Sequence, residues 1–440
     1  MNQVILLLAY FSIVIGYSYS KGWFSVGGLA LLLTGFLLVG YAFIKRKYSR
    51  ETTKVKETLN TMFSMGLFLS IAFGNDLWDH DMNGFVSLAM LSARLLLWLA
   101  LLISLLYIIP APFFLRHVNR IKFFILTFIA VFLRFLMLKI VLFPQVDIFF
   151  NIKFRAMEIL SLHNPYSLSY TYPPNLAPLP SHYPYGPLSL IVLLPFNLMG
   201  DPRLAIIAAD IITTVLLYLL NKKGSPSREM IPLLYLYHPQ ALFFAILSAL
   251  DNIIVSLLAI FFYLFQKKKY YMAFLALAFI GGIKHAYTPL MIFPLRMGLS
   301  RKIFLPFLVA FAFLGTSYGI FILWDLPGIK HNLLDVFAAF PQTWLVPASL
   351  SVQSLLTKQS IVTPQLNFKP SILFGLVPFV IVFLSTFIFS GKSLYRIALG
   401  IILSFSTFVF FAPYALFQYY FLISSLVLIA MSLNHSDRIT

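Results

Sequence analysis

The chain has 440 residues, of which 60% are hydrophobic and only 10% are charged, and its mean hydropathy is +0.90. This composition excludes an ordinary soluble protein and predicts an all-α membrane protein. The interior of a bilayer offers no water to the backbone, so each span must close its hydrogen bonds internally, as a helix does. The net charge of +18 comes from short Lys and Arg clusters between apolar runs, so it indicates cytoplasmic loops rather than nucleic-acid binding, and the lack of cysteine excludes disulfides and thiolate metal sites.

The first 122 residues are expected to form an N-terminal extension of about four transmembrane helices. Apolar length places these spans at 3–20, 23–44, 59–73 and 85–109. The first apolar stretch has neither a basic start nor a clear cleavage site, so it is interpreted as a retained span. The rest of the chain, residues 123–440, is expected to be a catalytic transmembrane module with outer loops at 144–202 and 325–370, which brings the predicted total to about 13 or 14 helices.

The loop "NDLWDHDMNG" between the third and fourth spans holds the only dense acidic cluster. Two interpretations are open for its side chains: a divalent metal site or a solvated polar turn. The residues concerned are Asp76, Asp79, His80 and Asp81.

A fifth span at 123–143 leads to a segment predicted to lie on the outer face, since the basic clusters then all fall inside. Asp147 stands just after this span. It is followed by an amphipathic helical pattern that carries Lys153, Arg155 and Glu158. A carboxylate and two cations are therefore expected close together at a membrane boundary, where ionisable side chains are candidates for function.

The next stretch, "NPYSLSYTYPPNLAPLPSHYPYGP", runs from Asn164 to Pro187 and is rich in tyrosine and proline. Eight prolines between Pro144 and Pro187 exclude a continuous helix. Its rings suit either an interfacial aromatic belt or a substrate-binding surface. The candidate substrate-binding residues in this stretch are Asn164, Tyr166, Tyr172, His182, Tyr183 and Tyr185.

Further along, "GPLSLIVLLPFNLMG" is expected to be a re-entrant or surface helix, and 203–220 a full span with Asp210 at its middle, paired with a nearby cation. Residues 229–247, 252–266 and 271–295 form short apolar segments. They are interrupted by residues that break helices or resist burial, namely Pro239, Asp251, Lys284 and Pro289.

Lys284 and His285 lie in the apolar run "GGIKHAYTPLMIFPL". A buried cation is costly without an anionic partner. Two partners are open: the carboxylate of Asp251, or the phosphate of a lipid substrate.

The order of these motifs resembles that of GT-C glycosyltransferases, especially the family 87 type of mannosyltransferase. The motifs are an Asp after an inward-to-outward span, then "NPY", "YPP" or "YPYGP", "HP" leading to a late Asp, and "GIK" leading to "FPL". The resemblance covers residues 145 to about 295. It implies a polyprenyl-phosphate or dolichyl-phosphate sugar as donor and Asp147 as catalytic base. About four additional spans ahead of the one that leads to Asp147, and "SALDN" around Asp251, depart from the family pattern.

The expected function is therefore transfer of a hexose, such as mannose, from a lipid-phosphate donor to a hydroxyl of a glycan, glycolipid or protein on the extracytoplasmic face of a cell membrane. Asp147 would be the base, and Asp251 would contact substrate. Lys284, His285, Arg155 and Lys153 would hold the donor phosphate. The sequence assigns no cofactor, and a divalent metal would be compatible. The alternatives are a lipid or glycolipid transporter without transferase activity and an accessory membrane subunit.

Overall fold

A computed structural model of the chain describes residues 2–20, 24–45, 53–76, 88–108, 116–142, 144, 147–167, 182–221, 225, 227–335, 349–358, 368–390, 393–412, 415 and 417–433. All regular secondary structure in these ranges is helical. This confirms the all-α class predicted from composition.

The helices follow one another along the whole chain. They are α1 (Asn2–Tyr19), α2 (Val26–Ile44), α3 (Thr53–Asp76), α4 (Leu88–Ile108), α5 (Arg116–Ile140), α6 (Asp147–Phe150), α7 (Ala156–Glu158), α8 (Pro187–Leu198), α9 (Arg203–Leu220), α10 (Ser227–Leu236), α11 (Ala241–Leu247), α12 (Asp251–Gln266), α13 (Tyr270–Ile283), α14 (Arg301–Trp324), α15 (Leu326–Lys330), α18 (Val352–Lys358), α19 (Phe368–Phe389), α20 (Leu394–Phe411) and α21 (Phe417–Leu433). Two π-helical turns, η2 (Asn151–Arg155) and η5 (His331–Asp335), and two 3-10 segments, η3 (Ile159–Ser161) and η4 (His285–Met297), complete the described elements.

Several of these helices are suited to a lipid bilayer. In the described part of the chain, six helical segments are long and apolar enough to cross a membrane. They lie within α1, α2, α5, α9, α14 and α20. The pair α10 and α11 adds a seventh if it forms one span bent by 44°. Shorter apolar helices include α12 and α13. The chain is thus a membrane-embedded helical protein. The predicted count of 13 or 14 helices stays a prediction, since the described residues supply six or seven such spans.

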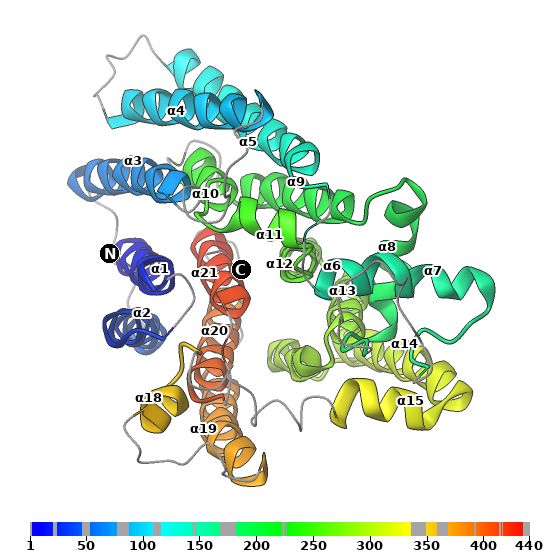
Figure 1. Cartoon of the computed structure of the whole chain (residues 1–440). Coiled ribbons are helices and arrows are strands. Elements are labelled where there is room, and N and C mark those ends of the chain that lie inside the picture. The colour runs from blue at the N-terminus through cyan, green and yellow to red at the C-terminus, as the bar shows by residue number, and fades with distance from the viewer. Residues whose placement is uncertain are drawn as a thin grey trace.

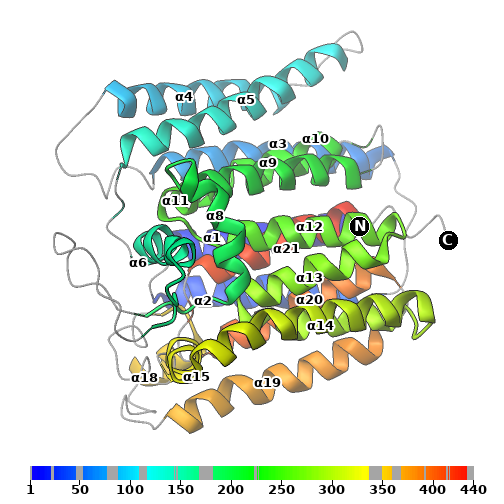
Figure 2. The ribbon, with the colours of Figure 1, turned by 90° about the vertical axis from the view of Figure 1, so that its right-hand side faces the viewer.

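The long helices lie side by side around α21, which packs against α1, α12 and α20 (Figure 1). The side chains of α21 from Tyr420 onward are almost completely buried, so it is the core of the bundle. Seen from the side, α1 begins and α21 ends at the same end (Figure 2). The opposite end, called the distal end below, carries α6, α15 and α18 (Figure 2).

The neighbouring helices α12 and α13 are shorter than the six candidate spans. With 16 and 14 residues, α12 and α13 are about 24 and 21 Å long, whereas the apolar core of a bilayer is about 30 Å thick. Both helices are therefore shorter than this apolar core, and α8 packs against α13. The predicted domain boundary at residue 122 falls inside α5, and the proposed division of the chain stays a prediction.

Candidate functional site

A buried ion pair joins the distal ends of α12 and α13. The ammonium of Lys284 lies 2.7 Å from the Oδ2 atom of Asp251, with side chains that are 11% and 1% exposed. The Tyr287 hydroxyl donates to the other carboxylate oxygen at 3.1 Å. The ammonium also lies 5.3 Å from the ring centroid of Tyr419. Of the two partners predicted for Lys284, the structure therefore shows the carboxylate of Asp251.

The local backbone explains how this pair forms. Helix α13 ends at Ile283, and Lys284 is extended, with φ −132° and ψ 107°. The chain then continues as the 3-10 segment η4, which His285 begins as a half-buried residue. Because the helix stops at this point, Lys284 turns toward the first residue of α12, and the 3-10 turn brings Tyr287 to the same carboxylate.

A second buried network lies directly beside the first. Arg134 of α5 and Asp210 of α9 are fully buried, and their charged groups are 2.6 Å apart. Asp210 also accepts from the hydroxyl of Tyr235 at 2.7 Å and from Nδ2 of Asn252 at 2.8 Å. The predicted pairing of Asp210 with a cation is confirmed. Since Asn252 adjoins Asp251 on α12, the two ion pairs meet at the start of that helix.

The tyrosines nearest the two ends of the Tyr- and Pro-rich stretch are packed into the protein. Tyr166 and Tyr183 are fully buried and Tyr185 nearly so. Successive rings contact edge to face, with centroids 5.7 and 5.4 Å apart. The hydroxyl of Tyr166 donates to the Tyr185 carbonyl at 2.7 Å, and burial raises its pKa well above 10, so it stays a neutral donor. These rings pack the two described ends of the stretch against each other; their predicted contact with substrate stays a prediction.

This aromatic segment is attached to the end of α13. The Gly186 amide donates to the carbonyl of Ile283 at 2.8 Å, one residue before Lys284. A β-carbon on Gly186 would lie 2.3 Å from the Gly282 carbonyl oxygen and 2.4 Å from the Tyr318 hydroxyl. Only glycine lets the two backbones approach this closely. Gly186 thus anchors the aromatic segment beside the ion pair.

Asn332 of η5 joins the two ends of the aromatic stretch. Its Nδ2 atom donates to the Tyr166 carbonyl at 2.9 Å, and its Oδ1 atom accepts from the Tyr183 amide. Sequence reasoning missed Asn332, as it missed Arg134 and Asn252. The only signal for Arg134 was a lone cation within an apolar run, and no local pattern indicated the two asparagines.

The segment that begins at Asp147 is held to the same assembly. Arg155 is fully buried and donates to the carbonyl of Pro165 at 2.8 Å, so it fastens this segment to the "NPY" turn. The Asn197 side chain of α8 donates to the Ile152 carbonyl at 2.9 Å. Asp147 is the first residue of α6, but its side chain lies outside the described residues.

The remaining predicted residues are dispersed. Oδ1 of Asn164 accepts from the Tyr166 amide at 2.9 Å and closes the "NPY" turn. Lys153 lines a separate pocket on the flank of the bundle, and His182 is half-buried. Tyr172, the side chain of Asp76, and residues 79–81 lie outside the described residues. Among the residues that are described, no cluster of three His, Asp or Glu side chains could hold a metal.

The sequence matches no protein-family model, and searches of curated proteins and of solved structures found no significant match. The chemistry of the site must therefore be inferred from its own residues. At the distal ends of α12 and α13, a buried ammonium, two phenols and a carboxylate form a polar site within an apolar bundle. Such a site could bind an anionic head group next to the acyl chains of a membrane.

Proposed function

We propose that the chain is a membrane glycosyltransferase that takes its sugar from a polyprenyl-phosphate donor and works at the distal end of the bundle, on the extracytoplasmic side. The donor lipid would lie among the apolar helices, with its phosphate near Lys284. The acceptor hydroxyl would approach from the aqueous side, near α6.

The observation that carries this proposal is the linkage between motifs that are far apart in the sequence. Arg155 joins the Asp147 segment to the "NPY" turn. Tyr166 of that turn bonds to Tyr185 of "YPYGP", and Gly186 bonds to the residue before Lys284. Segments that resemble one family only through their order in the sequence are thus neighbours in space, which is what a shared active site requires.

The proposed reaction is an in-line displacement at the anomeric carbon. The acceptor oxygen forms the new bond, the bond from that carbon to the phosphate oxygen breaks, and the polyprenyl phosphate leaves with the electron pair. Asp147 takes the hydroxyl proton. Lys284 has three N–H donors and directs one toward Asp251, so the others are available to stabilise the charge that develops on the phosphate.

A transporter is the second candidate, because α10 and α11 are bent by 44° relative to each other at a short break, as a broken span or a re-entrant loop would be. Broken helices near the middle of a membrane form substrate sites in many transporters. The break places His238 2.5 Å from the hydroxyl of Tyr17 and 3.0 Å from that of Ser424. The imidazole is therefore held between α1 and α21, which favours a fixed bend over a moving gate.

One assay separates the two candidates. Purified protein would be reconstituted with a mannosyl polyprenyl phosphate, and release of polyprenyl phosphate would be followed with and without a glycan acceptor. A transferase releases the lipid phosphate only when the acceptor is present. A transporter moves the intact donor across the bilayer and releases none.

A further inference from the structure

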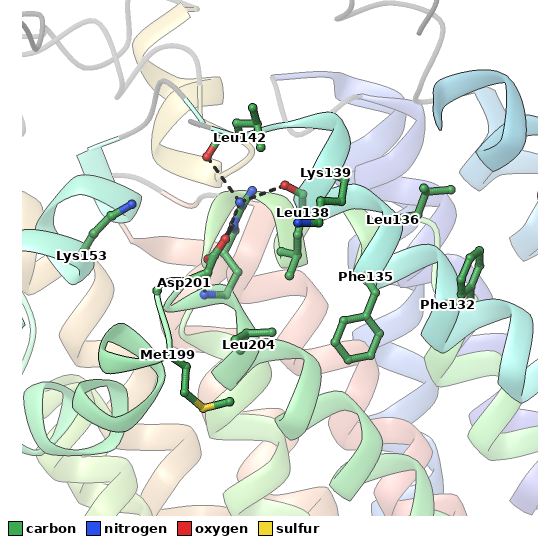
Figure 3. Close-up of a pocket in the computed structure, with 12 residues that line it drawn as sticks. Phe132, Phe135, Leu136, Leu138, Lys139, Leu142, Lys153, Met199, Asp201 and Leu204 are labelled. Atoms are coloured by element: carbon green, nitrogen blue, oxygen red, sulfur yellow. Dashed lines mark hydrogen bonds and ion pairs between the residues drawn. The ribbon is translucent and has the colours of Figure 1, made fainter. Parts of the chain in front are cut away.

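A pocket on the flank of the bundle lies apart from the site described above. It is an open pocket bounded by the last turns of α5, the turn η2 and the start of α9, and its volume is about 610 Å³ (Figure 3). It is lined by Phe132, Phe135, Leu136, Leu138, Lys139, Leu142, Lys153, Met199, Gly200, Asp201, Arg203 and Leu204.

The polar floor of this pocket is the ion pair between Arg203 and Asp201. Arg203 contacts Asp201 at 2.6 Å, and it donates to the carbonyls of Leu138, Val141 and Leu142 at the end of α5. The exposed carbonyls of a helix end carry partial negative charge. Arg203 therefore neutralises both the carboxylate and the helix end, so neither would repel an anion in the pocket.

Two further cations line the same pocket. Lys139 lies in the last turn of α5, is exposed, and makes no hydrogen bond or ion pair with another described residue. Lys153 comes from η2 on the opposite side, with its ammonium 5.5 Å from the centroid of the Phe149 ring (Figure 3). The residues that line the pocket thus include three cations, Lys139, Lys153 and Arg203, and one carboxylate, Asp201. This excess of cations attracts an anion.

The wall that runs along α5 is apolar. Phe132 and Phe135 are each more than 40% exposed, on the outer surface of this apolar helix, where they would meet acyl chains. Lys139 lies in the last turn of this helix, and lysines near the end of an apolar span typically extend their ammonium groups to the level of the lipid head groups. Charge at one end and aromatic side chains below it match a lipid that has a phosphate above its acyl chains.

We propose that this pocket binds an anionic phospholipid of the surrounding bilayer, with the phosphate between Lys139 and Lys153 and an acyl chain against Phe132 and Phe135. The bound lipid bridges α5 to η2. Because η2 directly follows α6, the lipid helps to hold the Asp147 segment against α9. This inference does not depend on the proposed transferase activity.

The test is lipid binding to the full-length protein in a neutral detergent. Native mass spectrometry and the thermal unfolding midpoint would be recorded with dioleoyl phosphatidylglycerol, with dioleoyl phosphatidylcholine and with a polyprenyl phosphate. Phosphatidylglycerol should be retained and should raise the midpoint. Lys139→Gln and Lys153→Gln should each weaken its retention about fivefold, since a lysine near a lipid head group contributes about that much to binding. Lys139→Arg should preserve binding.

The matched control is Lys302→Gln, which removes the same charge from an exposed position at the start of α14. It should bind phosphatidylglycerol like the wild type. Equal retention by the wild type and by Lys139→Gln would show that the lysines only extend toward head groups, and would overturn the proposal. Retention of polyprenyl phosphate but not of phosphatidylglycerol would also overturn it, because the pocket would then belong to a carrier lipid.

Discussion

Lys284 and Asp251 face each other across the distal ends of two short helices, 33 residues apart in the sequence and 2.7 Å apart in space. Removing one partner of a buried ion pair leaves the other charge uncompensated, which lowers the free energy of unfolding by about 3–5 kcal/mol. Lys284→Met should therefore lower the unfolding midpoint in detergent strongly. The double variant with Asp251→Asn should regain part of the loss, because the remaining amide is neutral. Purely additive losses in this cycle would show that the two residues are not coupled.

The ion pair between Arg134 and Asp210 is more deeply buried than that between Lys284 and Asp251. Arg134 also donates to the Leu236 carbonyl, and Asp210 also accepts from the Tyr235 hydroxyl. Arg134→Met should cost about as much as breaking the first pair, and Asp210→Asn should partly rescue it. The measurement is again a thermal double-mutant cycle. Arg301→Met is the matched control, since it removes an exposed cation and should change the midpoint little. A midpoint for Arg134→Met equal to that of this control would contradict the assignment.

The close approach of Gly186 to the end of α13 makes a steric prediction. Gly186→Ala places a methyl group against backbone that cannot easily move, so it should destabilise the protein by about 1–3 kcal/mol. Gly315→Ala is the matched control, because a β-carbon there would meet nothing within 4 Å. It should be neutral or slightly stabilising, since alanine favours helices over glycine. Similar midpoints for the two variants would argue against the contact between Gly186 and Gly282.

The proposed orientation can be tested by thiol labelling, because the chain has no cysteine of its own. The side chain of His163 is 72% exposed beyond η3, and Lys302 is exposed at the start of α14. His163→Cys should react with an impermeant maleimide from outside intact cells, and Lys302→Cys only after the membrane is opened. Labelling of both from the same side would contradict the proposed topology.

The sequence predicted where helices stop better than it predicted which residues meet. Helix α9 covers the predicted span 203–220, and α12 begins at Asp251, where a break was expected. Helix α13 ends just before Lys284. These agreements have a common cause, because a charge or proline in an apolar run interrupts a helix whatever its neighbours are.

Contacts between distant helices could not be read in the same way. Arg134 and Asp210 are 76 residues apart, and nothing in the local pattern of either helix specifies the other. Tyr166 reads equally well as an interfacial ring or as a buried one. Its burial depends on a carbonyl 19 residues away and on Asn332 in another segment. Such pairings arise from tertiary packing, which the helical periodicity of a sequence does not predict.

The most direct test of the proposed function is turnover by Asp147→Asn. The substitution keeps the shape of the side chain and removes the base, so release of polyprenyl phosphate should fall about 100- to 10,000-fold. The unfolding midpoint and retention of the lipid donor should stay close to those of the wild type. Asp335→Asn, a matched change at a half-exposed carboxylate beyond α15, should keep most of the activity. Turnover by Asp147→Asn equal to that of Asp335→Asn would contradict the role of Asp147 as the base.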